Sequence, residues 1–137
     1  MSRNRLRCGA VVFVVCLSGC MRPGLTGTAG LKEMARTELY FGMSMADGKT
    51  VSDADWQTFV DEQITPKFKD GLTIIDASGQ YLDKSKKLVR EKTKVVILVH
   101  PDTPKSRIDI FNIINAYKMR FRQESVLRVT DRVGASF

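Results

Sequence analysis

Four side chains have chemical groups and positions suited to binding or transforming a small molecule. His100 is the only histidine of the chain, and an imidazole can transfer protons near neutral pH. Glu38, Tyr40 and Arg128 each lie between apolar residues in segments that read as strands. Since strand side chains alternate between faces, these three would point to the open face of a sheet. There they could form a polar pocket for a small anionic or hydroxylated ligand.

The same residues also have a structural interpretation, and the sequence favours it. A lone histidine that is followed by Pro101 and Asp102 usually orders a loop. Glu38 and Arg128, if the first and last strands are neighbours, would form a cross-strand ion pair on a solvated sheet. Both interpretations stay open at the level of sequence.

Motifs of well-known catalytic and cofactor sites are missing from the sequence. The chain has no serine nucleophile elbow, no glycine-rich phosphate loop after a strand and no His-Glu-x-x-His motif. With no second histidine, and no free cysteine after the processing expected below, a transition-metal site would need carboxylates alone, and none are spaced for one. The sequence therefore predicts neither a metal nor a cofactor, and it leaves open whether the protein is an enzyme.

Two segments are basic: residues 84–87, in the predicted hairpin loop 83–87, and residues 90–92, in the strand that follows it. They could contact anionic lipid head groups or glycan by long-range attraction. The simpler interpretation is a solvated hairpin tip, and the sequence favours it. Because no aromatic residues are interleaved with these charges, nucleic acid is not an expected partner.

The first residues match the pattern of a secretory signal peptide. Residues 1–7 carry three arginines and no acid, and the ten residues from Cys8 to Leu17 are uncharged. A basic segment followed by a short apolar stretch is typical of such a signal. Ten helical residues span about 15 Å, roughly half of a hydrocarbon core, so we expect no permanent membrane span here.

The apolar stretch ends in Leu17-Ser18-Gly19-Cys20, which resembles the lipobox of bacterial lipoproteins. The resemblance implies that Cys20 is diacylated and becomes the new N-terminus. Two acyl chains are enough for stable membrane anchoring. The expected location is therefore the cell envelope. Because Met21 and not aspartate follows, a Gram-negative host would place the protein in the outer membrane, facing the periplasm.

Processing would change the chemistry of the chain. Removing 19 residues and three arginines from the 137-residue chain would leave 118 residues and lower the formal charge from +7 to +4. Cys8 and Cys16 would leave with the signal, and Cys20 would carry lipid. No cysteine would then remain for a disulfide, a zinc site or a thiol nucleophile.

The mature chain is expected to have a tether and one domain. Residues 20–35 are rich in glycine and threonine and show no period, which is typical of a flexible linker. Residues 36–137 form the single folded domain in this interpretation, and about 100 residues suffice for a modest core.

Hydrophobic periodicity predicts strands over residues 37–45, 71–82, 89–99 and 125–130, the last extended or followed by 133–137. A bulge is expected at Ser78 and Gly79. Helices are predicted over residues 52–65, before Pro66, and 104–121. This order predicts an α+β, ferredoxin-like β-α-β-β-α-β sandwich, with two helices on one face of an antiparallel sheet.

The apolar positions predict how this sandwich packs. One helix would bury the stripe Trp56, Phe59, Val60 and Ile64, and the other would bury Ile110, Phe111, Ile114, Tyr117 and Phe121. Val96, Leu98 and Val126 would lie on the open sheet face, where a second subunit would cover them.

Several blocks of the sequence together resemble a known family. They are residues 38–42, 70–73, 79–80, 89–91, 100–101, 116–118 and 123–129. As a set, they identify the chain as similar to the bacterial domain-of-unknown-function family 3574, whose members are small secreted or lipid-anchored proteins. The resemblance covers residues 37–137 and implies an envelope location without a known reaction. Met43 departs from the basic residue expected after Tyr-Phe-Gly in many relatives.

Two functions are compatible with these observations. The favoured one is a lipid-anchored envelope module that binds a small ligand or a protein on its open sheet face, with a homodimer as one form of it. The alternative is a small dimeric α/β-barrel-type enzyme, with its cavity between two sheets and His100, Glu38 or Tyr40 near the substrate. The sequence does not specify the ligand.

Overall fold

A computed structural model describes residues 30–45, 47–83 and 85–137. The predicted signal peptide, Cys20 and most of the predicted tether lie outside the described residues. In chain order the elements are strand β1 (Lys32–Gly42), helix α1 (Asp53–Phe59), π-helical turn η1 (Val60–Ile64), strand β2 (Thr73–Leu82), strand β3 (Leu88–His100), helix α2 (Pro104–Phe121) and strand β4 (Leu127–Ala135).

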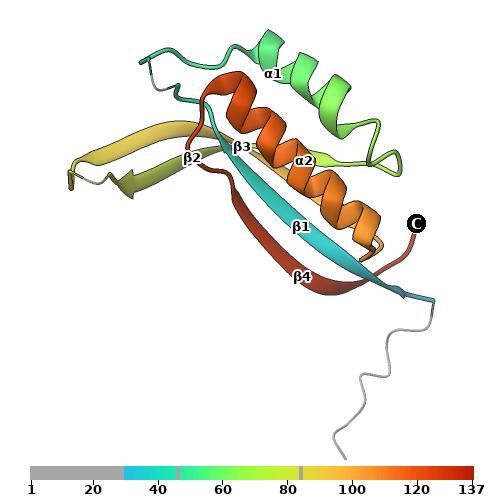
Figure 1. Ribbon diagram of the computed structural model, residues 1–137. Helices are drawn as coiled ribbons and strands as arrows, with labels where there is room; N and C mark the ends of the chain where they lie inside the picture. Colours follow the sequence, from blue (N-terminus) through green and yellow to red (C-terminus); the bar gives the residue numbers. More distant parts are fainter. Residues whose placement is uncertain (1–29, 46, 84) are drawn as a thin grey trace, which may run out of the picture.

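The four strands form one antiparallel sheet in the order β2-β3-β1-β4. Both helices lie on one side of this sheet, and none of the described residues forms a helix on the opposite side (Figure 1). The predicted α+β sandwich of the ferredoxin-like type is therefore confirmed. β1 and β3 are the central strands, whereas β2 and β4 are the edges.

Strand β1 carries the alternation that the sequence predicted. Leu39, Phe41 and Met43 are buried against the helices, and Glu38 and Tyr40 point to the open face. The strand begins at Lys32, four residues before the predicted start of the domain, because these residues pair with β4.

The two edge strands are more regular than expected. β2 pairs with β3 without interruption, so the predicted bulge at Ser78 and Gly79 is wrong. Gly79 has a different reason to be glycine: an added Cβ would lie 2.9 Å from Oγ1 of Thr93 on the neighbouring strand. The glycine gives the Thr93 side chain room on the sheet surface. β4 likewise continues as one strand through the gap predicted after Thr130.

Helix α1 begins where the sequence predicted. The Ser52 hydroxyl caps the helix by accepting a hydrogen bond from the Asp55 amide, at 3.0 Å. The helix then widens into η1, where the Thr65 amide donates to the Val60 carbonyl, five residues earlier. Pro66 follows directly, in agreement with the predicted end.

Helix α2 has the predicted bounds, with Thr103 as N-cap and Pro104 in its first turn. Its buried stripe is Ile110, Ile113, Tyr117 and Phe121. Phe111 was predicted to be in this stripe, but 61% of it is exposed. The reason is geometric: Phe111 lies about 100° around the helix from Ile110, on the solvent side.

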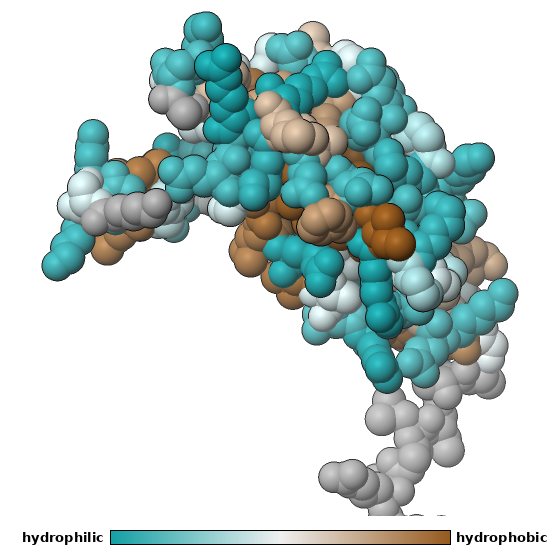
Figure 2. All heavy atoms as spheres, viewed as in Figure 1, coloured by the Kyte–Doolittle hydropathy of each residue, from teal (hydrophilic) through white to brown (hydrophobic). Residues whose placement is uncertain are grey.

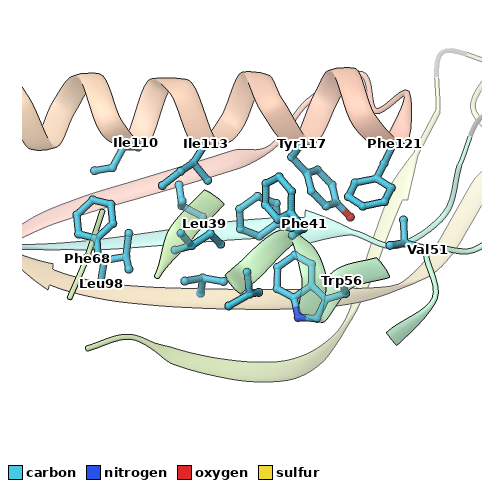
Figure 3. Packing of buried hydrophobic residues seen from close by; sticks show 14 of the residues in the cluster. Leu39, Phe41, Val51, Trp56, Phe68, Leu98, Ile110, Ile113, Tyr117 and Phe121 are labelled. Carbon is cyan, nitrogen blue, oxygen red and sulfur yellow. The ribbon is translucent and has the colours of Figure 1, made fainter. Parts of the chain in front are cut away.

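An aromatic cluster forms the centre of the core (Figure 3). The Phe41 ring lies 4.7 Å from Tyr117, 5.2 Å from Trp56 and 6.1 Å from Phe59, measured between ring centroids. The Tyr117 hydroxyl donates to the Gly42 carbonyl at 2.9 Å, which satisfies the only polar group of this side chain. Burial raises the pKa of Tyr117 well above its usual value.

The prediction that Val96 and Leu98 cover the open face is wrong. Both are fully buried, because the register sets Val96 opposite Leu39 and Leu98 opposite Thr37, on the helix side. Val126 also packs partly against the core. Viewed from the helix side, the surface is mostly hydrophilic, with scattered apolar groups along α2 (Figure 2). Within the described residues, no helix is long and apolar enough to cross a membrane.

Candidate functional site

The open sheet face carries a chain of three polar side chains on β1. The Arg36 guanidinium contacts Oε1 of Glu38 at 2.5 Å, and the Tyr40 hydroxyl donates to Oε2 of Glu38 at 2.5 Å. The three residues are spaced two apart, so all of them point to the same face. The hydrogen bond to Glu38 raises the pKa of Tyr40. Each oxygen of Glu38 therefore already has a partner, which fixes the carboxylate in place.

Apolar side chains border this polar chain on both sides. On β3, Ile97 lies opposite Glu38 and Val95 lies opposite Tyr40. On β4, the corresponding neighbours of Glu38 and Tyr40 are Val129 and Leu127. Ile75 extends the apolar border onto β2, opposite Val95. The exposed fractions are 59% for Leu127, 45% for Ile75 and 38% for Val129. The open face is thus a polar row between two apolar borders.

The register of β4 corrects the expected position of Arg128. Arg128 pairs with Leu39, whose side chain is in the core, so Arg128 lies on the helix side of the sheet and not beside Glu38. Arg36 is the actual cationic partner of Glu38. The sequence contained a signal for it, because Arg36 and Glu38 occupy alternate positions of the same strand and must share a face.

His100 also lies on the helix side, opposite Ala35. Only 4% of it is exposed. Its Nδ1 donates to the Pro101 carbonyl at 2.9 Å, and its Nε2 is 3.0 Å from Oγ1 of Thr37. Thr37 Oγ1 is in turn 3.1 Å from Oγ1 of Thr130 on β4. Both ring nitrogens have partners, so this geometry matches the structural interpretation, in which the ring orders the end of β3.

The predicted candidates therefore divide between two faces. Glu38 and Tyr40 share the open face, while His100 and Arg128 lie on the helix side. A small cavity of about 140 Å³ adjoins His100, but the ring uses both nitrogens for hydrogen bonds within the protein. In the part of the chain that the structure describes, no three His, Cys, Asp or Glu side chains are grouped to hold a metal ion.

The fold defines a small α+β sandwich whose sheet has one covered and one open face. The chain belongs to the family described as "Protein of unknown function (DUF3574)", which it matches over residues 36–137. The resemblance seen in the sequence is thereby confirmed. No curated protein matches the chain in sequence.

Two solved structures match the chain. One is a phage SAM lyase in complex with S-methyl-5'-thioadenosine, with 15% sequence identity and a TM-score of 0.59, covering 76% of this chain and 90% of that chain. The other is a phage SAM lyase in the apo state, with 19% identity and a TM-score of 0.49, covering 78% of this chain and 86% of that chain. At this identity the first likeness shows a common fold.

Proposed function

We propose that the protein is a lipid-anchored module of the cell envelope that binds a second copy of itself through the open sheet face. The observation that carries this proposal is the polar row of Arg36, Glu38 and Tyr40 between exposed apolar borders. Exposed apolar patches beside polar residues usually mark an interaction site. Among the described residues the helices cover the central part of the other side of the sheet, whereas no described element covers the open face.

The size of this face suits a modest interface. Four strands spaced about 4.8 Å apart, over a ladder of about eight residues, give a planar extent of about 500 Å². Side-chain relief raises the accessible area above that extent, toward the roughly 800 Å² per partner of a standard interface. The face is therefore large enough for a specific dimer.

The charges on the face are complementary to themselves. Arg36 is positive, and its ion-pair partner Glu38 is negative. Asp131, the residue of β4 that lies opposite Arg36, is also negative. A two-fold dimer brings the same surface of both copies together, so each copy offers the partner both signs of charge. A face with charges of one sign only would repel the same face of a second copy, whereas this face carries both signs.

Anchoring strengthens such a contact. The signal-like N-terminus and the Leu17-Ser18-Gly19-Cys20 block support lipidation at Cys20. Two copies held in one membrane meet at a much higher effective concentration than free copies do. A face that associates weakly in solution can then pair on the membrane.

A second candidate is the enzyme in which two sheets enclose a cavity. The similar phage SAM lyase is in complex with S-methyl-5'-thioadenosine, which supports the idea that this fold can bind small polar molecules. In this chain, the fixed carboxylate of Glu38 and the hydroxyl of Tyr40 would line such a cavity. A dimer with unexplained electron density between the sheets would favour the enzyme, and a closely packed interface would favour the module.

The test compares two matched substitutions. Leu127→Glu adds a charge to the open face, whereas Ile108→Glu adds the same charge to the outer side of α2, and the two side chains are 59% and 58% exposed. Sedimentation velocity of the mature chain without lipid should show a concentration-dependent dimer that Leu127→Glu abolishes and Ile108→Glu keeps. A monomer at all concentrations, or a dimer that survives Leu127→Glu, would contradict the proposal.

A further inference from the structure

A cleft of about 650 Å³ lies on the helix side of the sheet, away from the open face. Its floor is the outer part of β2 and β3, and its wall is the segment that leads from β1 into α1. In Figure 1 the β2–β3 hairpin extends beyond the two helices, which leaves this part of the sheet without a helix above it. The volume is in the range of about 300–1,000 Å³ that small-ligand sites occupy.

Lys94 organises one end of the cleft. Its ammonium group lies 2.5 Å from Oδ1 of Asp76 on β2 and 3.3 Å from Oδ1 of Asp53 at the start of α1. The Lys94 side chain is only 16% exposed, whereas those of Asp76 and Asp53 are 82% and 92% exposed. The lysine thus holds two carboxylates that remain open to the cleft. Their hydrogen bonds raise the pKa of Lys94, so it stays charged.

The charges of the cleft are distributed unevenly along β3. The group of Asp53, Asp76 and Lys94 has a net charge of −1. Lys92 lies two residues away on the same side of β3, where its cross-strand neighbour is Ser78 and not an acid. Among the described residues Lys92 takes part in no ion pair. The cleft therefore has a negative end and a positive end.

This arrangement selects a class of ligand. The negative end can accept hydrogen bonds from an ammonium group, and Lys92 can donate to a carboxylate. A phosphate would be repelled by the two carboxylates, and an uncharged polyol has no charged group with which either end could pair. From the two opposite ends we infer that the cleft is a binding site for a zwitterionic ligand, namely a short peptide with free termini.

The spacing of the two ends sets the length of that ligand. Two residues along a strand cover about 6.8 Å, which is the distance between Lys94 and Lys92 along β3. An extended dipeptide spans about 7 Å, since each residue adds about 3.5 Å. Met43 and Val51 also line the cleft and give its wall an apolar part that suits small apolar side chains of the peptide. Alanylalanine has the expected length and character.

The experiment is isothermal titration of alanylalanine into the native protein, purified in a nonionic detergent. N-acetyl-alanylalanine and alanylalanine amide each lack one terminal charge, and glucose serves as an uncharged polyol. Binding of alanylalanine should exceed binding of each blocked peptide by roughly tenfold to hundredfold, the effect of one charge-assisted hydrogen bond. Binding of glucose or of the blocked peptides with equal affinity would overturn the inference, as would the absence of alanylalanine binding.

Three substitutions complete the test. Lys92→Gln should remove the preference for a free carboxylate, and Asp76→Asn should weaken the preference for a free amine. Lys32→Gln is the control, because Lys32 is an exposed lysine at the opposite end of β1. If Lys92→Gln behaves like Lys32→Gln, the inference fails, even if Asp76→Asn perturbs the fold. Leu127→Glu should leave peptide binding unchanged, which separates this site from the proposed dimer.

Discussion

Replacing Thr37 by valine tests how the end of β3 is held in place. Thr37 is fully buried, and its hydroxyl lies between Nε2 of His100, at 3.0 Å, and Oγ1 of Thr130, at 3.1 Å. The Pro101 carbonyl can only accept, so Nδ1 of His100 donates to it. In the neutral ring, Nε2 then accepts from Thr37, and Thr37 accepts from Thr130.

The expected loss of folding free energy in Thr37→Val follows from this order of donors. Valine has the shape of threonine, so Thr37→Val creates no cavity but leaves Nε2 of a ring that is 4% exposed without its donor. A buried polar atom that loses its partner costs about 1–3 kcal/mol of folding free energy. For a domain of this size, each kcal/mol lowers Tm by about 4 °C or more.

Urea denaturation followed by far-UV circular dichroism measures this change. Thr130→Val is the control, because Thr130 is exposed and its loss should change the unfolding free energy by no more than about 0.5 kcal/mol. The double variant Thr37→Val, His100→Phe should lose less unfolding free energy than the two single variants lose in sum, because each single change already removes the hydrogen bond between the two side chains. Equal effects of Thr37→Val and Thr130→Val would refute the reasoning.

Three further predictions concern the N-terminus, the start of the domain and acid stability. Mass spectrometry of the native protein should find residues 1–19 absent and a lipid on Cys20; an intact signal or a soluble chain cut elsewhere would contradict this. A fragment that begins at Gly30 should be more stable to urea than one that begins at Arg36, because the shorter one loses buried Ala35 and the pairing of residues 32–35 with β4. Equal stability would place the start of the domain at Arg36. Added reductant should change the stability of neither fragment. The Arg107 guanidinium, 2.8 and 2.9 Å from the two Asp102 oxygens, holds the pKa of Asp102 below its ordinary value of 3.8. This stabilisation is present above pH 3.8 and is lost as the pH falls through the lower folded-state pKa, so the advantage of the native chain over Asp102→Asn should disappear in acid and persist at neutral pH.

The sequence by itself determined the elements that are buried on one side and exposed to solvent on the other. The alternation from Thr37 to Met43 placed Leu39 and Phe41 inside, because a central strand beneath a helix layer has one buried and one open face, and large apolar side chains are buried on the first. The cap at Thr103 and the bounds of α2 were likewise readable, since capping is a local interaction. The same locality explains why the family resemblance and the order of elements were correct.

Only the tertiary structure decided which residues of the edge strand β4 lie on which face of the sheet. Most residues of β4 are exposed, so its alternating pattern did not reveal that Leu127 and Val129, and not Arg128, face the open side. A shift of one residue in register exchanges the two faces, and an edge strand has little burial to prevent it. The cleft shows the same limit. Asp53, Asp76 and Lys94 come from three different elements, and only their packing brings the two carboxylates to one ammonium group.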